Sequence, residues 1–130
     1  MDQTVNEVVG TVERMTAAFQ AGDVEAVMRA YEPGAVVAFE PGRPVTDSAL
    51  MRQTFAEWCA LSPRFVYRGH EVLVAGDLAV HLAPWQMRGT APGGVAIEQG
   101  GLSVAVLRRQ PSGDWLMVID NPHGQWLLQR

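Results

Sequence analysis

Apolar positions in the first third of the chain recur at the three- and four-residue steps of amphipathic helices. In residues 4–21 one helical face carries the apolar side chains Val5, Val8, Val9, Val12, Met15 and Phe19. Gly22 fits the left-handed residue that ends a helix, and Asp23 fits the N-cap of the next one. A second helix is expected over residues 24–31, because Pro33-Gly34 breaks helices. The pattern therefore predicts a helical hairpin at the start.

The next thirty residues predict one strand and one more helix. Residues 35–39 are an apolar run with β-branched side chains, which is typical of a strand. The segment from Glu40 to Pro44 contains two prolines and a glycine and predicts a rigid loop. Thr46 or Asp47 then caps a third helix that continues to about Ala60. Its expected buried face carries Leu50, Met51, Phe55, Trp58 and Cys59.

The remainder of the chain predicts long strands joined by turns. Residues 65–75 and 78–89 form two strands around the tight turn Gly76-Asp77, with Pro84 marking a bulge or an edge. Residues 95–109 form a third, in which Gly100-Gly101 predicts a sharp bend or a bulge. Residues 115–120 form the last strand. Helices followed by such a meander indicate an α+β fold with an antiparallel sheet.

Composition narrows the class of protein. The length of 130 residues suits one domain, and no apolar run approaches the roughly 18 residues of a membrane span. The first residues lack the basic segment of a signal peptide, and a single cysteine, Cys59, excludes an internal disulfide, so we expect a cytoplasmic protein. The net charge is -4 and all ten basic residues are arginines, which excludes lysine Schiff-base chemistry and disfavours nucleic-acid binding. The three histidines have no metal-ligand spacing, so neither a metal nor a cofactor is expected.

Long strands bent at glycines curl into a cone, and helices laid across its open face leave a cavity. The sequence therefore predicts a conical, strongly curved antiparallel sheet that is covered by three helices from the N-terminal half and holds one internal pocket. We expect this pocket to be lined by Met15, Phe39, Phe55, Trp58, Trp85 and Ser103.

The order of three segments resembles a known superfamily. These segments are AFQAGDVEAVMRAYEPGAVVAFEPG, VLVAGDLAVHLAPW and VAVLRRQPSGDWLMVIDNPHG. Together they are similar to the nuclear-transport-factor-2-like superfamily, and more narrowly to its small bacterial SnoaL-like, ketosteroid-isomerase-like branch. The resemblance spans nearly the whole chain and implies a conical sheet, an internal pocket and a homodimer through the outer face of the sheet. It implies no single function, because members include isomerases, cyclases, dehydratases, epoxide hydrolases and non-catalytic binders.

Glu40 is the first candidate for proton transfer. It follows an apolar strand and precedes Pro41, nearly where ketosteroid isomerases carry their proton-shuttling carboxylate. A carboxylate beside apolar walls has a raised pKa, but the favoured interpretation of Glu40 is a solvated loop residue, because one carboxylate in a loop is weak evidence for a site. The rest of the isomerase pattern is missing, because the first helix has Met15 near the position of the isomerase tyrosine and residues 101–104 contain no acid. True ketosteroid isomerisation is therefore not expected.

Asp120, His123 and His81 are the other candidates. Asp120 ends the last strand, as does an acid in the polyketide-cyclase branch, and it could orient His123 three residues later. Alternatively, Asp120 and Asn121 bond the local backbone in a turn before Pro122. His81 lies in the middle of a strand on the face of Trp85, where it is either a pocket donor or a core histidine.

Two functions fit these observations. The favoured one is a module that binds a small apolar organic ligand and forms a homodimer, with no nucleic-acid or membrane partner. The alternative is a cofactor-independent acid–base enzyme of the isomerase, cyclase or dehydratase type, acting on a small apolar carbonyl compound. In that case Glu40 or Asp120 is the base, and His81 or His123 is the donor.

Overall fold

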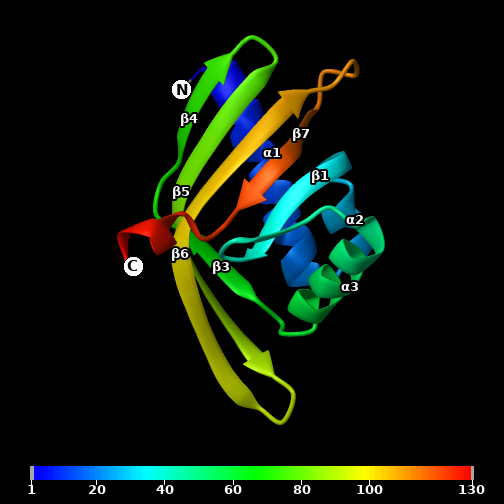
Figure 1. Ribbon diagram of the computed structural model, residues 1–130, viewed down its shortest axis with the longest axis vertical. Coiled ribbons are helices and arrows are strands. Elements are labelled where there is room, and N and C mark those ends of the chain that lie inside the picture. The colour runs from blue at the N-terminus through cyan, green and yellow to red at the C-terminus, as the bar shows by residue number, and fades with distance from the viewer. Residues whose placement is uncertain (1, 130) are drawn as a thin grey trace.

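The computed structural model describes residues 2–129 and has the expected α+β architecture, with helices packed against one strongly curved sheet (Figure 1). Its helices are α1 (Gln3–Ala21), α2 (Val24–Met28), α3 (Ser48–Cys59) and the short 3-10 helix η1 (Gly124–Leu128). Its strands are β1 (Tyr31–Glu40), β2 (Arg43–Val45), β3 (Arg64–Tyr67), β4 (Glu71–Ala75), β5 (Leu78–Ala91), β6 (Val95–Arg109) and β7 (Trp115–Asn121). None of the helices within residues 2–129 is long and apolar enough to cross a membrane.

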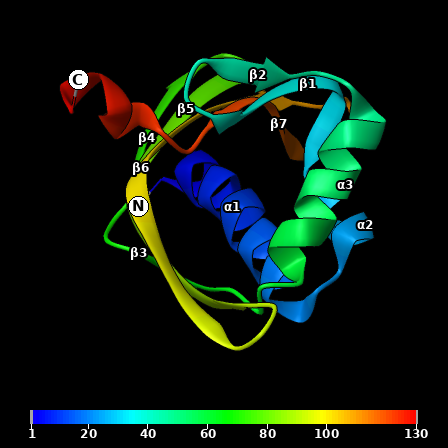
Figure 2. The same cartoon turned by 60° about the horizontal axis from the view of Figure 1, so that its bottom comes forward.

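Helix α1 lies inside the curve of the sheet (Figure 2). Its first turn is capped by the Asp2 side chain, which accepts a hydrogen bond from the Thr4 amide, and Gly22 ends it with a φ of 73°. Its apolar face is buried as the periodicity predicts. Thr11 fixes the helix to the sheet, because its buried hydroxyl donates to the carbonyl oxygen of Trp115 at 2.8 Å.

The sheet has the strand order β2-β1-β7-β6-β5-β3, with β4 also paired to β5. Strands β1 and β7 run parallel, whereas the other pairings among the described residues are antiparallel. The sheet is therefore mixed, and the expected antiparallel pairing is found except between β1 and β7. The last strand of the meander comes to lie beside the strand that leaves the helical hairpin, and the two point the same way. This parallel pair places Tyr31 opposite Met117 and Val37 opposite Asp120.

The second helix is shorter than the sequence predicts. It ends at Met28, and Tyr31 opens β1 instead of closing the helix. The backbone of Ala30 is already bound to the sheet, since its carbonyl oxygen accepts from the Met117 amide at 2.8 Å. The strand continues through Pro33-Gly34, where the register against β7 shifts and Gly34 adopts a φ of 82°. Tertiary pairing thus overrides the helical periodicity.

The strand expected over residues 65–75 is two strands, β3 and β4, and Pro84 of β5 explains the break. The Arg68 amide donates to the Pro84 carbonyl oxygen at 2.9 Å, but a proline has no amide hydrogen to return. Tyr67 pairs with Trp85 on one side of this point, and Glu71 pairs with Leu82 on the other. On the opposite side of β5, the register with β6 runs without a shift through Gly100-Gly101, so these glycines form no bulge. Strand β6 is curved along its length (Figure 1).

Phe55 lies at the centre of the aromatic core. Its ring is fully buried, and its centroid lies 5.4 Å from that of Phe19, 5.2 Å from Tyr31 and 5.1 Å from Phe39. These contacts join α3 to α1 and to β1. Rings at such separations gain from edge-to-face and tilted packing in addition to burial.

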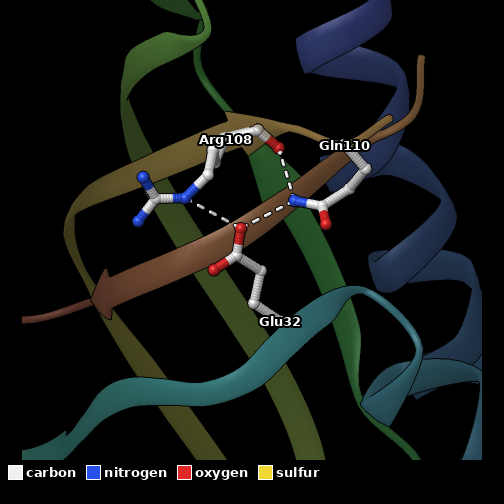
Figure 3. Close-up of polar contacts among 3 residues, drawn as sticks. All are labelled: Glu32, Arg108 and Gln110. Carbon is white, nitrogen blue, oxygen red and sulfur yellow. Dashed lines mark hydrogen bonds and ion pairs between the residues drawn. The ribbon is translucent and has the colours of Figure 1, made fainter. Parts of the chain in front are cut away.

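A polar cluster joins β1 to the turn between β6 and β7 (Figure 3). One oxygen of Glu32, Oε2, accepts from Arg108 Nε at 2.9 Å and from Gln110 Nε2 at 2.6 Å. The Gln110 amide group also donates to the Arg108 carbonyl oxygen at 3.1 Å. Because β7 lies between β1 and β6, this cluster bridges across the strand that carries Asp120.

Candidate functional site

A cavity of about 350 Å³ lies between the helices and the inner face of the sheet. Seven aromatic side chains line it: Phe19, Tyr31, Phe39, Trp58, Phe65, Tyr67 and Trp85. The polar side chains in its wall are Gln99, Ser103, Asp120 and His123, together with the two tyrosine hydroxyl groups. The lining, taken from residues 2–129, contains no arginine. The cavity is therefore apolar and carries its potential charge at Asp120 and His123.

Asp120 and Tyr31 form the central polar pair of this wall. The Tyr31 hydroxyl donates to Asp120 Oδ2 at 2.5 Å and also lies 3.3 Å from the sulfur of Met15. Both residues are buried, with exposed fractions of 8% for Asp120 and 6% for Tyr31. Within residues 2–129, Asp120 Oδ1 has no hydrogen-bond partner, so one carboxyl oxygen is left for a bound molecule. The parallel pairing of β1 and β7 creates this pair from residues 89 positions apart.

Burial sets the protonation of the pair. Burial raises the pKa of Asp120, and the hydrogen bond from Tyr31 and the charge of His123 only partly oppose this effect. Burial also raises the pKa of Tyr31 well above its usual value, and the charge and hydrogen bond of Asp120 add to the increase. The phenol therefore stays protonated and donates, while the carboxyl group has a proton affinity above that of an exposed aspartate.

The segment after β7 forms part of the cavity wall and is held by its own contacts. The Asn121 side chain accepts a hydrogen bond from the His123 amide at 3.0 Å. This bond forms the local turn that was expected from the sequence as the alternative to an Asp120–His123 pair. His123 Nε2 donates to the carbonyl oxygen of Phe39 at 2.9 Å, and Trp85 Nε1 donates to that of Pro122 at 2.9 Å. Asn121 makes the local turn, whereas Asp120 turns to Tyr31. Asp120 and His123 both line the cavity, but no hydrogen bond joins them.

His81 lies on the inner face of the sheet as its alternation predicts, but outside the cavity lining. Only 1% of the residue is exposed, and its Nε2 lies 2.7 Å from Nδ1 of His70. Burial, together with the charge of His70, lowers the pKa of His81 to about 4. The structure therefore places a neutral core histidine here, in a pair that the sequence did not predict.

Glu40 lies outside the cavity. Its side chain is 68% exposed and its Oε2 lies 3.7 Å from Nη1 of Arg43. The register of β1 against β2 shifts between Ala38 and Glu40, so Phe39 lines the cavity and Glu40 projects into solvent. The surroundings of Glu40 therefore agree with the interpretation of a solvated residue.

Of the six residues expected to line the pocket, five do so: Met15, Phe39, Trp58, Trp85 and Ser103. Phe55 does not line it, because its ring fills the core behind Phe39. Sequence reasoning missed Tyr31 and Tyr67, although Tyr favours strands and Pro33-Gly34 already argued against a helix there. No group of three or more His, Cys, Asp or Glu side chains in the described part of the chain is arranged to hold a metal ion.

The curved sheet, the inner helix and the cavity between them define the nuclear-transport-factor-2-like fold, and solved structures agree. One is a nuclear-transport-factor-2-like superfamily protein from Salmonella enterica, with a TM-score of 0.79, 13% identity, and coverage of 89% of this chain and 87% of that one. Another is a protein of this class with a cystatin-like fold from Novosphingobium aromaticivorans, with a TM-score of 0.75, 18% identity, and coverage of 89% and 78%. The association domain of CaMKII from C. elegans has a TM-score of 0.70, 17% identity, and coverage of 89% and 92%.

Sequence comparison gives the family within this fold. The model of the SnoaL-like domain matches residues 12–118, so the chain belongs to the SnoaL-like domain family. The superfamily and the branch expected from the sequence are thereby confirmed. No curated protein matches the sequence.

The raised pKa of Asp120 predicts how stability depends on pH. A carboxyl group with a folded pKa above its ordinary value of 3.8 costs stability as the pH rises from 3.8 through the folded pKa. Asp120→Asn removes that cost and keeps an acceptor for Tyr31. We expect the variant to have a higher free energy of unfolding than the wild type at pH 8, and the difference to shrink as the pH falls toward 3.8. Urea denaturation across this range measures it.

Asp77→Asn is the matched control, since Asp77 is exposed in the turn before β5. Its free energy of unfolding should stay within about 0.5 kcal/mol of the wild type at both ends of the range. A difference between Asp120→Asn and the wild type that does not change with pH would contradict the assignment of Asp120 as a buried carboxyl group with a raised pKa.

Proposed function

We propose that the protein binds a small, largely apolar organic molecule in the cavity. The observation that carries this proposal is an aromatic-lined space of about 350 Å³ with a free carboxyl oxygen in its wall. Ligand sites have this character, because apolar walls supply affinity and a few fixed polar groups supply orientation. The volume is near the lower end of the range for such sites, roughly 300 to 1,000 Å³, which suits a molecule of one or two fused rings.

Indane, a neutral hydrocarbon of this size, tests whether the cavity binds such molecules. We expect indane to shift the indole N–H resonances of Trp58 and Trp85 in NMR spectra, because both rings line the cavity. Ser103→Phe places a ring at a half-buried lining position and should abolish the shifts. Val66→Phe enlarges a side chain that is 57% exposed and does not line the cavity, so it should bind indane as the wild type does. Equal shifts in both variants, or none in the wild type, would contradict the proposal.

A second candidate function is acid–base catalysis without a cofactor. One observation favours it: Asp120 Oδ1, in an otherwise apolar wall, makes no hydrogen bond within residues 2–129. Tyr31 holds the carboxyl group in place through Oδ2, so Oδ1 is the atom that would take a proton from a bound molecule or return one. The raised pKa of Asp120 brings the group closer to the range in which proton transfer is efficient.

Comparison of the wild type with Asp120→Asn in a mixture of cellular small molecules separates the two functions. If the protein is an enzyme, the wild type should consume at least one compound that Asp120→Asn leaves intact, as measured by mass spectrometry. If the protein is a pure binding module, neither the wild type nor the variant should consume any compound. Consumption of a compound at equal rates by both proteins would exclude Asp120 as the base.

The outer face of the sheet supports a homodimer. Pairing across five strands aligns one row of apolar side chains on this face: Val36, Leu73, Val80, Val106 and Ile119. Leu73 is 58% exposed and Ile119 45% exposed, although both are large aliphatic residues. We propose that a second copy of the chain covers this row, because a contiguous exposed apolar surface marks an interaction site.

Light scattering at micromolar concentration should therefore give the mass of a dimer for the wild type. Val106→Glu places a charge in the centre of the row and should shift the protein to monomer with an unchanged circular dichroism spectrum. Val95→Glu, at the tip of the β5–β6 hairpin and outside the row, should remain dimeric. A wild type that is monomeric at this concentration would overturn the proposed dimer.

A further inference from the structure

Four hydrogen-bonding groups of the cavity wall, Tyr31, Tyr67, Trp85 and His123, have already committed a proton inside the protein. Tyr31 has a single hydroxyl proton. The 2.5 Å distance to Asp120 Oδ2 shows that Tyr31 donates this proton in a hydrogen bond to the carboxyl group. Only the lone pairs of the Tyr31 oxygen are left for a ligand. The partner oxygen, Oδ2, is occupied as an acceptor in the same bond.

The hydroxyl proton of Tyr67 is also used inside the protein, in a hydrogen bond to Thr16. The Thr16 hydroxyl donates its one proton to the carbonyl oxygen of Val12 at 2.9 Å. In the 3.1 Å contact between Thr16 Oγ1 and the Tyr67 hydroxyl, Thr16 must therefore accept and Tyr67 must donate. Burial raises the pKa of Tyr67 to about 12, so the phenol keeps this proton. Its oxygen can then only accept from a bound molecule.

The two nitrogen donors near the end of β7 are committed as well. Trp85 Nε1 and His123 Nε2 each lie 2.9 Å from a backbone carbonyl oxygen, which can only accept. The indole of Trp85 then has no further donor, and the Nε2 proton of His123 is used. Three lining groups keep free donors within residues 2–129: the Trp58 indole on α3 and the side chains of Gln99 and Ser103 on β6, of which Gln99 is exposed.

From this inventory we infer that the cavity selects a ligand that donates hydrogen bonds to the Asp120–Tyr31 pair, namely an alcohol, a phenol or an N–H compound, in preference to a ketone or an aldehyde. The inference rests on the proposed binding function and names its ligand class. A hydroxyl group placed at Asp120 Oδ1 supplies the proton that the Asp120–Tyr31 pair lacks when the carboxylate is ionised. A carbonyl oxygen at the same point meets only the lone pairs of this pair, and buried polar groups avoid such unpaired positions.

This ligand class differs from the carbonyl compound that the sequence suggested. A base that forms an enolate needs donors beside the carbonyl oxygen to stabilise the developing charge. Around Asp120 the nearby donors of Tyr31, Tyr67, Trp85 and His123 are committed elsewhere. The Asp120–Tyr31 pair is therefore arranged to receive a proton from the ligand.

Binding of 1-indanol and 1-indanone, which share one ring system, tests the inference at pH 8. We expect the wild type to bind 1-indanol at least about tenfold more tightly than 1-indanone, as measured by NMR titration. In Asp120→Asn, Tyr31 donates to the amide oxygen and the amide NH₂ group faces the cavity as a new donor. The preference should then move toward 1-indanone. Asp77→Asn, which changes an exposed carboxylate in the same way, should keep the wild-type preference.

Tyr67→Phe gives a second test that leaves Asp120 in place. It removes an acceptor that the single hydroxyl proton of 1-indanol does not use when it is donated to Asp120. The preference for 1-indanol over 1-indanone should therefore stay as in the wild type, and its loss would place the ligand proton at Tyr67 instead. Equal or tighter binding of 1-indanone by the wild type, or an unchanged preference in Asp120→Asn, would overturn the donor selectivity while the binding function stands. A wild type that binds neither compound and does not bind indane would overturn the binding function itself.

Discussion

Strands β1 and β7 lie side by side in parallel, and their pairing brings Tyr31 against Asp120 across 89 residues of sequence. The cavity wall depends on this contact. It anchors a buried carboxyl group by one oxygen and directs the hydroxyl of Tyr31 away from the ligand. The Glu32 cluster with Arg108 and Gln110 reinforces the same region, because it joins β1 to the β6–β7 turn across β7 (Figure 3).

An acid in an apolar cavity is costly to ionise, and the protein offsets this cost with one short hydrogen bond and no adjacent arginine. Tyr67, Trp85 and His123 are tied to Thr16 or to the backbone, which uses their protons and leaves the Asp120–Tyr31 pair as a set of acceptors. A rigid set of acceptors discriminates between ligands by the placement of protons as well as by shape. The SnoaL-like fold supplies the cavity, whereas this arrangement of a few side chains determines what the cavity can recognise.

Much of the fold was predictable from local pattern. Helix α1 and helix α3 follow from apolar spacing and from caps at Gly22 and Asp47, and both are present with nearly the expected bounds. The long strands β5 and β6 follow from alternation between turn residues. The residues that turn into the cavity from these elements, such as Met15 and Trp85, were predictable because their faces are set by periodicity alone.

The sequence by itself therefore determined the α+β class and the polar end of β7 with Asp120 and His123, since each depends on patterns among residues close together in the chain. It also determined the family, because the order of such local segments along the chain carries the resemblance. The tertiary structure decided that β1 runs parallel to β7, that Tyr31 leaves the helix to join it, that Phe55 fills the core and that Glu40 faces solvent. It also paired His81 with His70. The physical reason is that periodicity specifies which face of an element is apolar, whereas strand order and register specify which distant residue that face meets.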